Sequence, residues 1–283
     1  MNFAQKLTSM DRELKSRVGT AAIGVSVLLV LIIFGGTIGT AVVATVISLG
    51  MVFEFVEMTF SLPDKREKKF ILLGATWLIA FFSILFPRGE YALLVFSLLA
   101  LFSYFLFTAE RYSEPELFTE HFKELMYSLF GVFYLAFFPL FLPAIRGAES
   151  GLHWTLIFLF VNWAGDTAAY FVGKKYGRQK LYPVISPKKT VEGAYGGLAA
   201  GLVVTLIYKV LFFRSMSWGA VILVPIIIGA VAQVGDLCES FLKRAFRKKD
   251  SGSILPGHGG FLDRFDGVLF SLPVMYACVR IFG

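Results

Sequence analysis

Long apolar runs recur along almost the whole of this chain, and they constrain its fold more than any other feature of the sequence. Short polar or basic stretches separate the runs, which continue to residue 282. About 20 apolar residues in a helix cross the hydrocarbon core of a bilayer, and only helices and closed barrels satisfy the backbone there. The sequence therefore predicts an all-α, polytopic bundle of transmembrane helices. We expect nine spans, at residues 18–34, 37–57, 70–86, 91–108, 125–145, 152–172, 192–213, 218–238 and 267–282.

The composition agrees with a membrane protein and argues against a nucleic-acid partner. The chain is 57% hydrophobic and 17% charged, whereas soluble proteins are about a quarter charged. Its formal net charge is +7, but no soluble basic domain is present to bind nucleic acid. Anionic lipid and the positive-inside rule account for the excess of Lys and Arg.

The distribution of basic residues predicts the orientation. With the N-terminus in the cytoplasm, nine spans place 22 of the 27 Lys and Arg residues on the cytoplasmic side, as the positive-inside rule requires. We therefore expect a protein of the cytoplasmic (inner) membrane whose active site faces the cytoplasm. We divide it into N-terminal helices, 1–150, that scaffold, dimerise or shape a lipid entrance, and a catalytic region, 151–283, with cytoplasmic loops at 173–191 and 239–266.

The loop at 239–266 is first basic, then glycine-rich, then acidic. Gly259 and Gly260 let the backbone approach a ligand closely. Asp263 and Asp266 lie three residues apart at the start of the last span, so a helix places both carboxylates on one face. Such hard oxygen ligands suit a Mg²⁺ ion that also holds substrate phosphates. The basic residues are dense enough to neutralise a polyphosphate, although a lipid-headgroup patch is the alternative: Lys243, Arg244, Arg247, Lys248 and Lys249.

The loop at 173–191 ends in a second candidate phosphate site. Ser186 followed by Pro187 has the pattern of a helix N-cap and first helical residue. Lys188, Lys189 and Thr190 would then lie at a helix N-terminus, where backbone N–H groups favour an anion. An ordinary capped helix with interfacial lysines is the alternative interpretation.

Polar residues within the predicted spans are further candidates, because charges in a bilayer are costly and usually face the protein interior. Asp236 lies near the cytoplasmic end of the eighth span, and exposure at the interface is its alternative explanation. Asn162 and Asp166 share one face of the sixth span, where a structural hydrogen bond to a neighbouring helix is the alternative. Glu54 and Glu57 lie nearer the membrane surface, and the sequence gives less reason to assign them a function.

The second loop resembles the signature of the phosphatidate cytidylyltransferase (CDP-diacylglycerol synthase) family. That signature reads Ser-x-x-Lys-Arg, four residues, Lys-Asp, then Pro-x-His-Gly-Gly-x-x-Asp-Arg-x-Asp. Every fixed position is present: Ser240, Lys243, Arg244, Lys249, Asp250, Pro256, His258, Gly259, Gly260, Asp263, Arg264 and Asp266. The segment 186–193 is similar to the family's other typical block. The resemblance is clear from about residue 162 to 266, and the first 150 residues match only as a set of spans.

The resemblance implies transfer of the cytidylyl group of CTP to phosphatidic acid, a step of phospholipid biosynthesis that gives CDP-diacylglycerol and pyrophosphate. It also implies Mg²⁺ held by Asp236 and Asp263, K⁺ as a second candidate ion, and a homodimer. The catalytic candidates are Asp236, Asp263, Asp266, Lys243 and Arg244. The substrate-binding candidates are Ser186, Lys188, Lys189, Thr190, Asn162, Asp166, Lys249, His258, Gly259, Gly260 and Arg264.

Two other functions remain open at this point. A CTP-dependent lipid kinase would transfer the γ-phosphate and release CDP instead of pyrophosphate. A membrane transporter would explain the acids within spans but not the basic, glycine-rich loop. It would usually also carry inverted repeats, which we do not find in the sequence.

Overall fold

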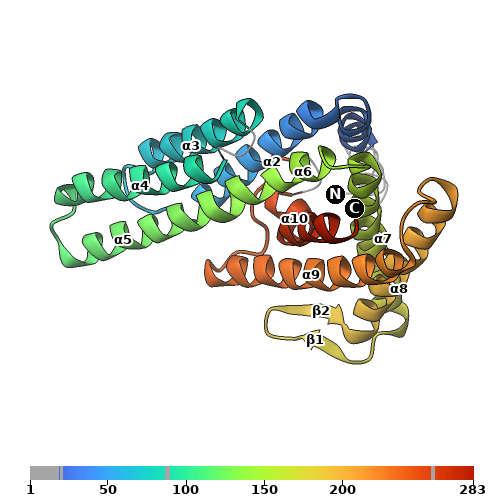
Figure 1. Ribbon diagram of the computed structural model, residues 1–283. Coiled ribbons are helices and arrows are strands. Elements are labelled where there is room, and N and C mark those ends of the chain that lie inside the picture. Colours follow the sequence, from blue (N-terminus) through green and yellow to red (C-terminus); the bar gives the residue numbers. More distant parts are fainter. Residues whose placement is uncertain (1–18, 20–21, 87–89, 256–258) are drawn as a thin grey trace. The chain divides into compact units, whose positions relative to one another are not determined.

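The computed structural model describes residues 19, 22–86, 90–255 and 259–283 (Figure 1). Within these residues, eight helices are long and apolar enough to cross a membrane. They correspond to the second to ninth predicted spans, which confirms the all-α polytopic fold. A shorter apolar helix, Ala22–Phe34, covers most of the first predicted span.

The predicted connection at residues 109–124 is mostly helical instead. A 3-10 turn, η1 (Ala109–Arg111), is followed by α5 (Pro115–Phe130), which begins well before the predicted span. The helical chain then continues through the π-helical η2 (Gly131–Phe137), η3 (Phe138–Leu140) and α6 (Phe141–Arg146). The sequence prediction failed here because α5 carries polar residues that hydropathy assigns to a loop, although tertiary partners bury several of them.

The chain forms two compact units. Unit 1 comprises residues 1–136 and 250–264, and unit 2 comprises residues 137–249 and 265–283. Unit 1 therefore combines most of the predicted N-terminal region with the glycine-rich part of the second loop. Unit 2 contains the first loop and the basic part of the second.

Unit 1 is built from α2 (Gly36–Thr59), α3 (Lys65–Leu85), α4 (Glu90–Thr108) and α5. Each of these helices packs against the next one in the chain (Figure 1). Their inner faces bury side chains such as Met51, Phe55 and Leu72, while Trp77 and Phe107 point outward. Exposed large apolar side chains on long helices are expected where lipid is the solvent.

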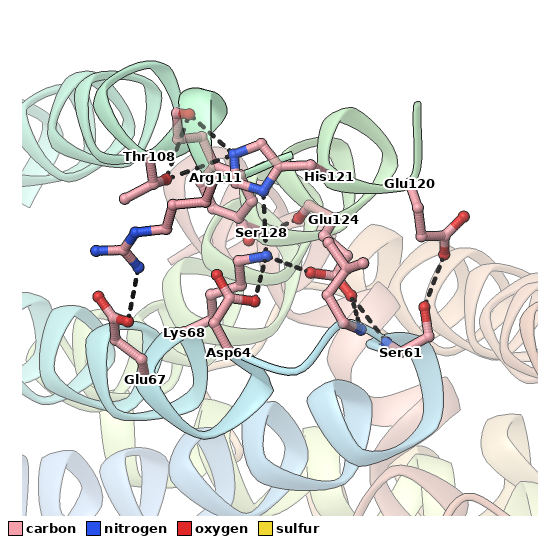
Figure 2. Close-up of polar contacts among 12 residues, drawn as sticks. Ser61, Asp64, Glu67, Lys68, Thr108, Arg111, Glu120, His121, Glu124 and Ser128 are labelled. Atoms are coloured by element: carbon pink, nitrogen blue, oxygen red, sulfur yellow. Dashed lines mark hydrogen bonds and ion pairs between the residues drawn. The ribbon is translucent and has the colours of Figure 1, made fainter. Parts of the chain in front are cut away.

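A buried lysine joins the polar ends of three of these helices (Figure 2). Lys68 is 1% exposed. Its Nζ lies 2.6 Å from Glu124 Oε2, 2.8 Å from Asp64 Oδ1 and 3.2 Å from His121 Nδ1. An ammonium group has three hydrogens, so these three acceptors satisfy it completely.

The partners of this lysine are held in turn. Glu124 Oε1 accepts hydrogen bonds from the backbone N–H groups of Ser61, at 2.8 Å, and Leu62, at 3.0 Å. His121 Nε2 lies 2.9 Å from the carbonyl oxygen of Phe105. Because Nδ1 accepts from the lysine, Nε2 carries the ring hydrogen and donates it. The network therefore ties the α2–α3 connection and α4 to α5.

Two aromatic rings cover the same ammonium group. The centroids of Phe105 and Tyr112 lie 5.1 and 5.2 Å from Lys68 Nζ, within the range of a cation–π interaction. Burial, together with the negative charge of Asp64, raises the pKa of the Tyr112 hydroxyl above its ordinary value. The hydroxyl therefore stays protonated.

Unit 2 is built from α7 (Gly151–Tyr176), α8 (Val191–Leu211), α9 (Trp218–Ala245) and α10 (Leu262–Phe282) from residue 265 onward, with α6. Between α7 and α8 the chain forms an antiparallel hairpin of β1 (Lys180–Tyr182) and β2 (Ser186–Thr190). Figure 1 shows this hairpin beyond the ends of the two helices.

Small residues let α7 and α8 approach each other closely. A Cβ atom added to Gly193 would lie 2.7 Å from the carbonyl oxygen of Ala169. One added to Gly197 would lie 2.9 Å from the carbonyl oxygen of Gly165. Small residues four positions apart on both helices commonly produce such backbone contact in membranes. The contact fixes the two helices that flank the hairpin.

Replacing Lys68 with Met should lower the free energy of unfolding by about 3–5 kcal/mol, because Glu124 and Asp64 would keep buried charges without their cation. Denaturant unfolding in detergent measures this change. The matched control is Lys123→Met, since Lys123 pairs with Glu120 at 3.1 Å while 53% exposed, and an exposed pair contributes about 1 kcal/mol or less. Similar losses in both variants would contradict a central role for Lys68.

Candidate functional site

A cavity of about 720 Å³ in unit 2 is lined by the hairpin and by α7, α8 and α9. Its size is typical of a small-molecule site. Five of its lining residues are ones that the sequence predicted for function: Asp166, Lys188, Lys189, Thr190 and Asp236. The structure thus brings the end of the first loop together with two of the acids within spans.

The charged lining of the cavity favours a polyanion. Four lysines, Lys174, Lys180, Lys188 and Lys189, line it together with two aspartates. Lys189 forms an ion pair with Asp236, and their side chains are 26% and 35% exposed. Both side chains are therefore accessible to a ligand that would replace one of them in the ion pair.

Further carboxylates of unit 2 gather around Asp266 on α10. The charges of Asp236, Glu239 and Asp166 all repel that of Asp266. Glu239 has a cation of its own, Lys243, whose Nζ lies 2.6 Å from Glu239 Oε2 one helical turn away. Acids this close together in membrane helices need cations nearby, and the lysine pairs supply part of that charge.

The prediction that Ser186 caps a helix is wrong. Ser186 begins strand β2, and α8 begins only at Val191. Thr190 is the N-cap, since its Oγ1 accepts a hydrogen bond from the N–H of Gly193 at 3.2 Å. The two predicted lysines therefore lie on a strand instead of a helix terminus. Pairing with β1 determines this, and a local Ser-Pro pattern does not reveal a strand partner.

Glu192 anchors the base of the hairpin, a role that the sequence interpretation did not assign. Its carboxylate accepts hydrogen bonds from the backbone N–H groups of Arg178, at 3.0 Å, and Gln179, at 3.2 Å. The N–H of Val191 also donates to the carbonyl oxygen of Gln179, at 2.9 Å. The only sequence signal for a function of Glu192 was its position within residues 186–193, the block that is similar to the family's other typical block. Lys174 and Lys180 were likewise missed, because only the fold brings them to the cavity.

Other predicted residues of unit 2 make structural contacts outside this cavity lining. Asn162 is buried, and its Nδ2 donates to the carbonyl oxygen of Phe158 at 2.8 Å. Arg244 Nη1 donates to the carbonyl oxygen of Lys248 at 3.1 Å, just past the end of α9. Lys249 is exposed. Their proposed contacts with substrate remain predictions.

The glycine-rich part of the second loop lies in unit 1 together with Asp263, whose carboxylate binds two described parts of that loop. Asp263 Oδ2 accepts hydrogen bonds from the N–H and the hydroxyl of Ser251 and from the N–H of Gly260, each at 3.0 Å. Gly259 has a φ of +81°, a left-handed conformation that favours glycine. Arg264 is exposed, and His258 lies outside the described residues.

The two predicted metal ligands belong to different units, Asp236 to unit 2 and Asp263 to unit 1. Their joint binding of an ion therefore remains a prediction from the sequence. Over the described parts of the chain, no group of three or more His, Cys, Asp or Glu side chains is arranged to hold a metal ion. A Mg²⁺ site made of one or two carboxylates and substrate phosphates needs no such group.

Known proteins resemble this chain over nearly its whole length. The sequence profile of the cytidylyltransferase family matches residues 15–282. A phosphatidate cytidylyltransferase of Bacillus subtilis is 31% identical over 96% of this chain and 99% of its own length. Proteins of the same name from Brucella suis (36% identity, 95% of this chain, 94% of its own) and Staphylococcus haemolyticus (34%, 93% and 97%) are also similar. The chain belongs to the cytidylyltransferase family.

Proposed function

We propose that this chain is an integral membrane enzyme that transfers the cytidylyl group of CTP to phosphatidic acid and so forms CDP-diacylglycerol and pyrophosphate. Family membership supports the reaction. The structural observation that carries the proposal is the cavity of unit 2, where three further lysines line the site together with the Lys189–Asp236 pair. That lining suits the triphosphate of CTP.

The chemistry of this transfer explains why charged residues dominate the site. A phosphate oxygen of phosphatidic acid attacks the α-phosphorus of CTP, and the bond from that phosphorus to the bridging oxygen breaks. The nucleophile is already anionic near neutral pH, so no strong base is required. The protein must instead hold two anions together and stabilise the charge that develops on pyrophosphate.

The Lys189–Asp236 pair gives the site a way to change partners when CTP binds. In the free protein the ammonium of Lys189 neutralises Asp236. A bound triphosphate offers Lys189 phosphate oxygens instead, and the carboxylate of Asp236 becomes available to another cation. Lys188 extends from the same strand, whose position Glu192 fixes at the base of the hairpin.

We propose that Asp236 holds Mg²⁺, with Asp263 as the second ligand that the sequence predicts. The chemistry fits, because Mg²⁺ prefers carboxylate and phosphate oxygens and the partly exposed carboxylate of Asp236 lines the cavity. When bound, the ion would neutralise charge on the phosphates. The proposal of K⁺ as an additional ion rests on the family resemblance alone.

The location and assembly are also proposals. The basic loops support a cytoplasmic-membrane protein whose site faces the cytoplasm, where CTP is found. Phosphatidic acid would then approach from the adjacent leaflet. A homodimer follows only from the resemblance.

A double-label assay tests the reaction. Purified protein in detergent receives phosphatidic acid, Mg²⁺ and CTP labelled separately at the α- and γ-phosphates. We expect the α-label in the lipid and the γ-label in released pyrophosphate. The γ-label in the lipid would indicate a kinase. If neither label reaches the lipid, the protein catalyses neither the cytidylyl transfer nor the kinase reaction, and the transporter hypothesis becomes the next one to test.

Replacing Asp236 with Asn should lower kcat by about 100- to 1000-fold, the usual cost of removing one electrostatic contact to a transition state. Removal of Mg²⁺ by a chelator should abolish turnover of the wild-type protein. Steady-state kinetics over a Mg²⁺ titration measure both effects. Glu149→Gln, at an exposed acid of unit 2, is the control and should retain wild-type kinetics. An Asp236→Asn variant with unchanged kcat would show that Asp236 does not hold the ion.

A further inference from the structure

Glu54 is a buried carboxylate of α2 that the proposed reaction does not use. Its side chain lies in a membrane-spanning helix and the residue is 2% exposed. A carboxylate removed from water needs hydrogen-bond donors inside the protein, or its burial is strongly unfavourable. The groups that donate hydrogen bonds to Glu54 therefore show which segment of the chain its carboxylate stabilises.

All of these donors come from the signature loop and the beginning of α10. Glu54 Oε2 accepts from the N–H of Leu262 at 3.1 Å and from the hydroxyl of Ser251 at 3.1 Å. The N–H of Phe261 is a further donor. Because α10 begins at Leu262, these N–H groups have no acceptor within the helix. Glu54 supplies one from another helix, with the negative charge that a helix N-terminus favours.

The hydroxyl of Ser251 connects Glu54 to Asp263. Ser251 Oγ lies 3.1 Å from Glu54 Oε2 and 3.0 Å from Asp263 Oδ2. A hydroxyl has one hydrogen, so it donates to one carboxylate at a time and bridges the two. Ser251 is itself buried. A continuous set of contacts thus runs from α2 through Glu54 and Ser251 to a signature aspartate.

Three glycines make room for this contact. A Cβ atom at Gly260 would lie 2.4 Å from Glu54 Oε2, and one at Gly252 would lie 2.5 Å from Glu54 Oε1. One at Gly50, on α2, would lie 2.6 Å from the ring of Phe261. Larger residues at these positions would push the loop away from α2. The second glycine of the His-Gly-Gly segment therefore has a structural requirement besides close approach to a ligand.

We propose that Glu54 is a positioning residue for cytidylyl transfer, an inference that rests on the proposed function. It holds Ser251, residues 259–261 and the start of α10 at Leu262 in one arrangement, so that Asp263 keeps a fixed orientation. The N-terminal helix α2 thereby contributes to the reaction without touching substrate. This gives unit 1 a role beyond that of a membrane scaffold.

Three variants separate positioning from general stability. Glu54→Ala should lower kcat by about 100-fold, the loss that a misplacement of about 1 Å can cause, while the KM for CTP changes less than about threefold. Glu54→Gln should recover most of kcat, because its amide oxygen can accept from both Leu262 and Ser251, as Glu54 Oε2 does. Glu57→Gln is the control, since Glu57 lies one turn away, is 41% exposed and pairs with Lys65 and Lys69.

Amide hydrogen exchange provides a readout that does not depend on activity. In Glu54→Ala, exchange should accelerate at residues 251–255 and 259–262 while α3, α4 and α5 keep wild-type protection. In Glu57→Gln it should not change anywhere in the loop. If Glu54→Ala does not fold, Ser251→Ala replaces it, because this variant removes only the bridging hydroxyl. It should show the same local exchange with about a tenfold loss of kcat.

Several results would overturn the inference. One is a wild-type kcat in Glu54→Ala, or in Ser251→Ala where Glu54→Ala does not fold. Another is a kcat in Glu54→Gln that stays as low as in Glu54→Ala. The third is faster exchange throughout the described helices of unit 1. Failure of the proposed function is distinguishable, because the wild-type protein itself would then transfer no cytidylyl group. The exchange data would still report whether Glu54 holds the loop.

Discussion

A carboxylate within a membrane helix has to find its donors inside the protein, because the bilayer core supplies no water. Both units of this chain are organised around that constraint. In unit 1, Glu124 is compensated by Lys68 and by two backbone N–H groups at the start of a neighbouring connection. In unit 2, Asp236 is compensated by Lys189 from the hairpin. Each acid thus fixes a segment that hydrophobic packing alone would leave undetermined.

Charged groups of unit 2 are brought together in the cavity that we propose as the nucleotide site. Helices α7 and α8 approach closely through glycine and alanine, and their ends carry a short hairpin instead of a flexible loop. Glu192 fastens the base of that hairpin, so its lysines face a cavity that also contains acids of α7 and α9. Cations on a strand and acids on helices then provide the charge that phosphoryl chemistry requires.

Much of the fold was predictable from the sequence, because hydropathy reports directly on what can lie in lipid. Eight spans follow from apolar runs alone. The failures occurred where a polar residue is buried by a distant partner. His121 and Glu124 made the beginning of α5 resemble a connection, because nothing local indicates that Lys68 lies against them.

The site was predictable to a similar extent and for similar reasons. The signature residues could be found from their spacing, and five predicted residues line one cavity. Ser186 was assigned to a helix cap because strand pairing between residues 180–190 depends on contacts that a local pattern does not encode. Glu54 was undervalued because its partners, Ser251 and Leu262, lie some two hundred positions later in the chain. Local chemistry was readable, whereas long-range pairing required the structure.

Lysine reactivity would show directly whether the cavity of unit 2 holds the nucleotide. Each lysine of the purified protein would be acylated with and without saturating CTP and Mg²⁺, and quantified by mass spectrometry. We expect CTP to lower the reactivity of Lys188 and Lys189 severalfold, with smaller protection at Lys174 and Lys180. The exposed Lys123 should react equally in both conditions. Unchanged reactivity at all four cavity lysines, in protein that turns over CTP, would show that the nucleotide binds elsewhere.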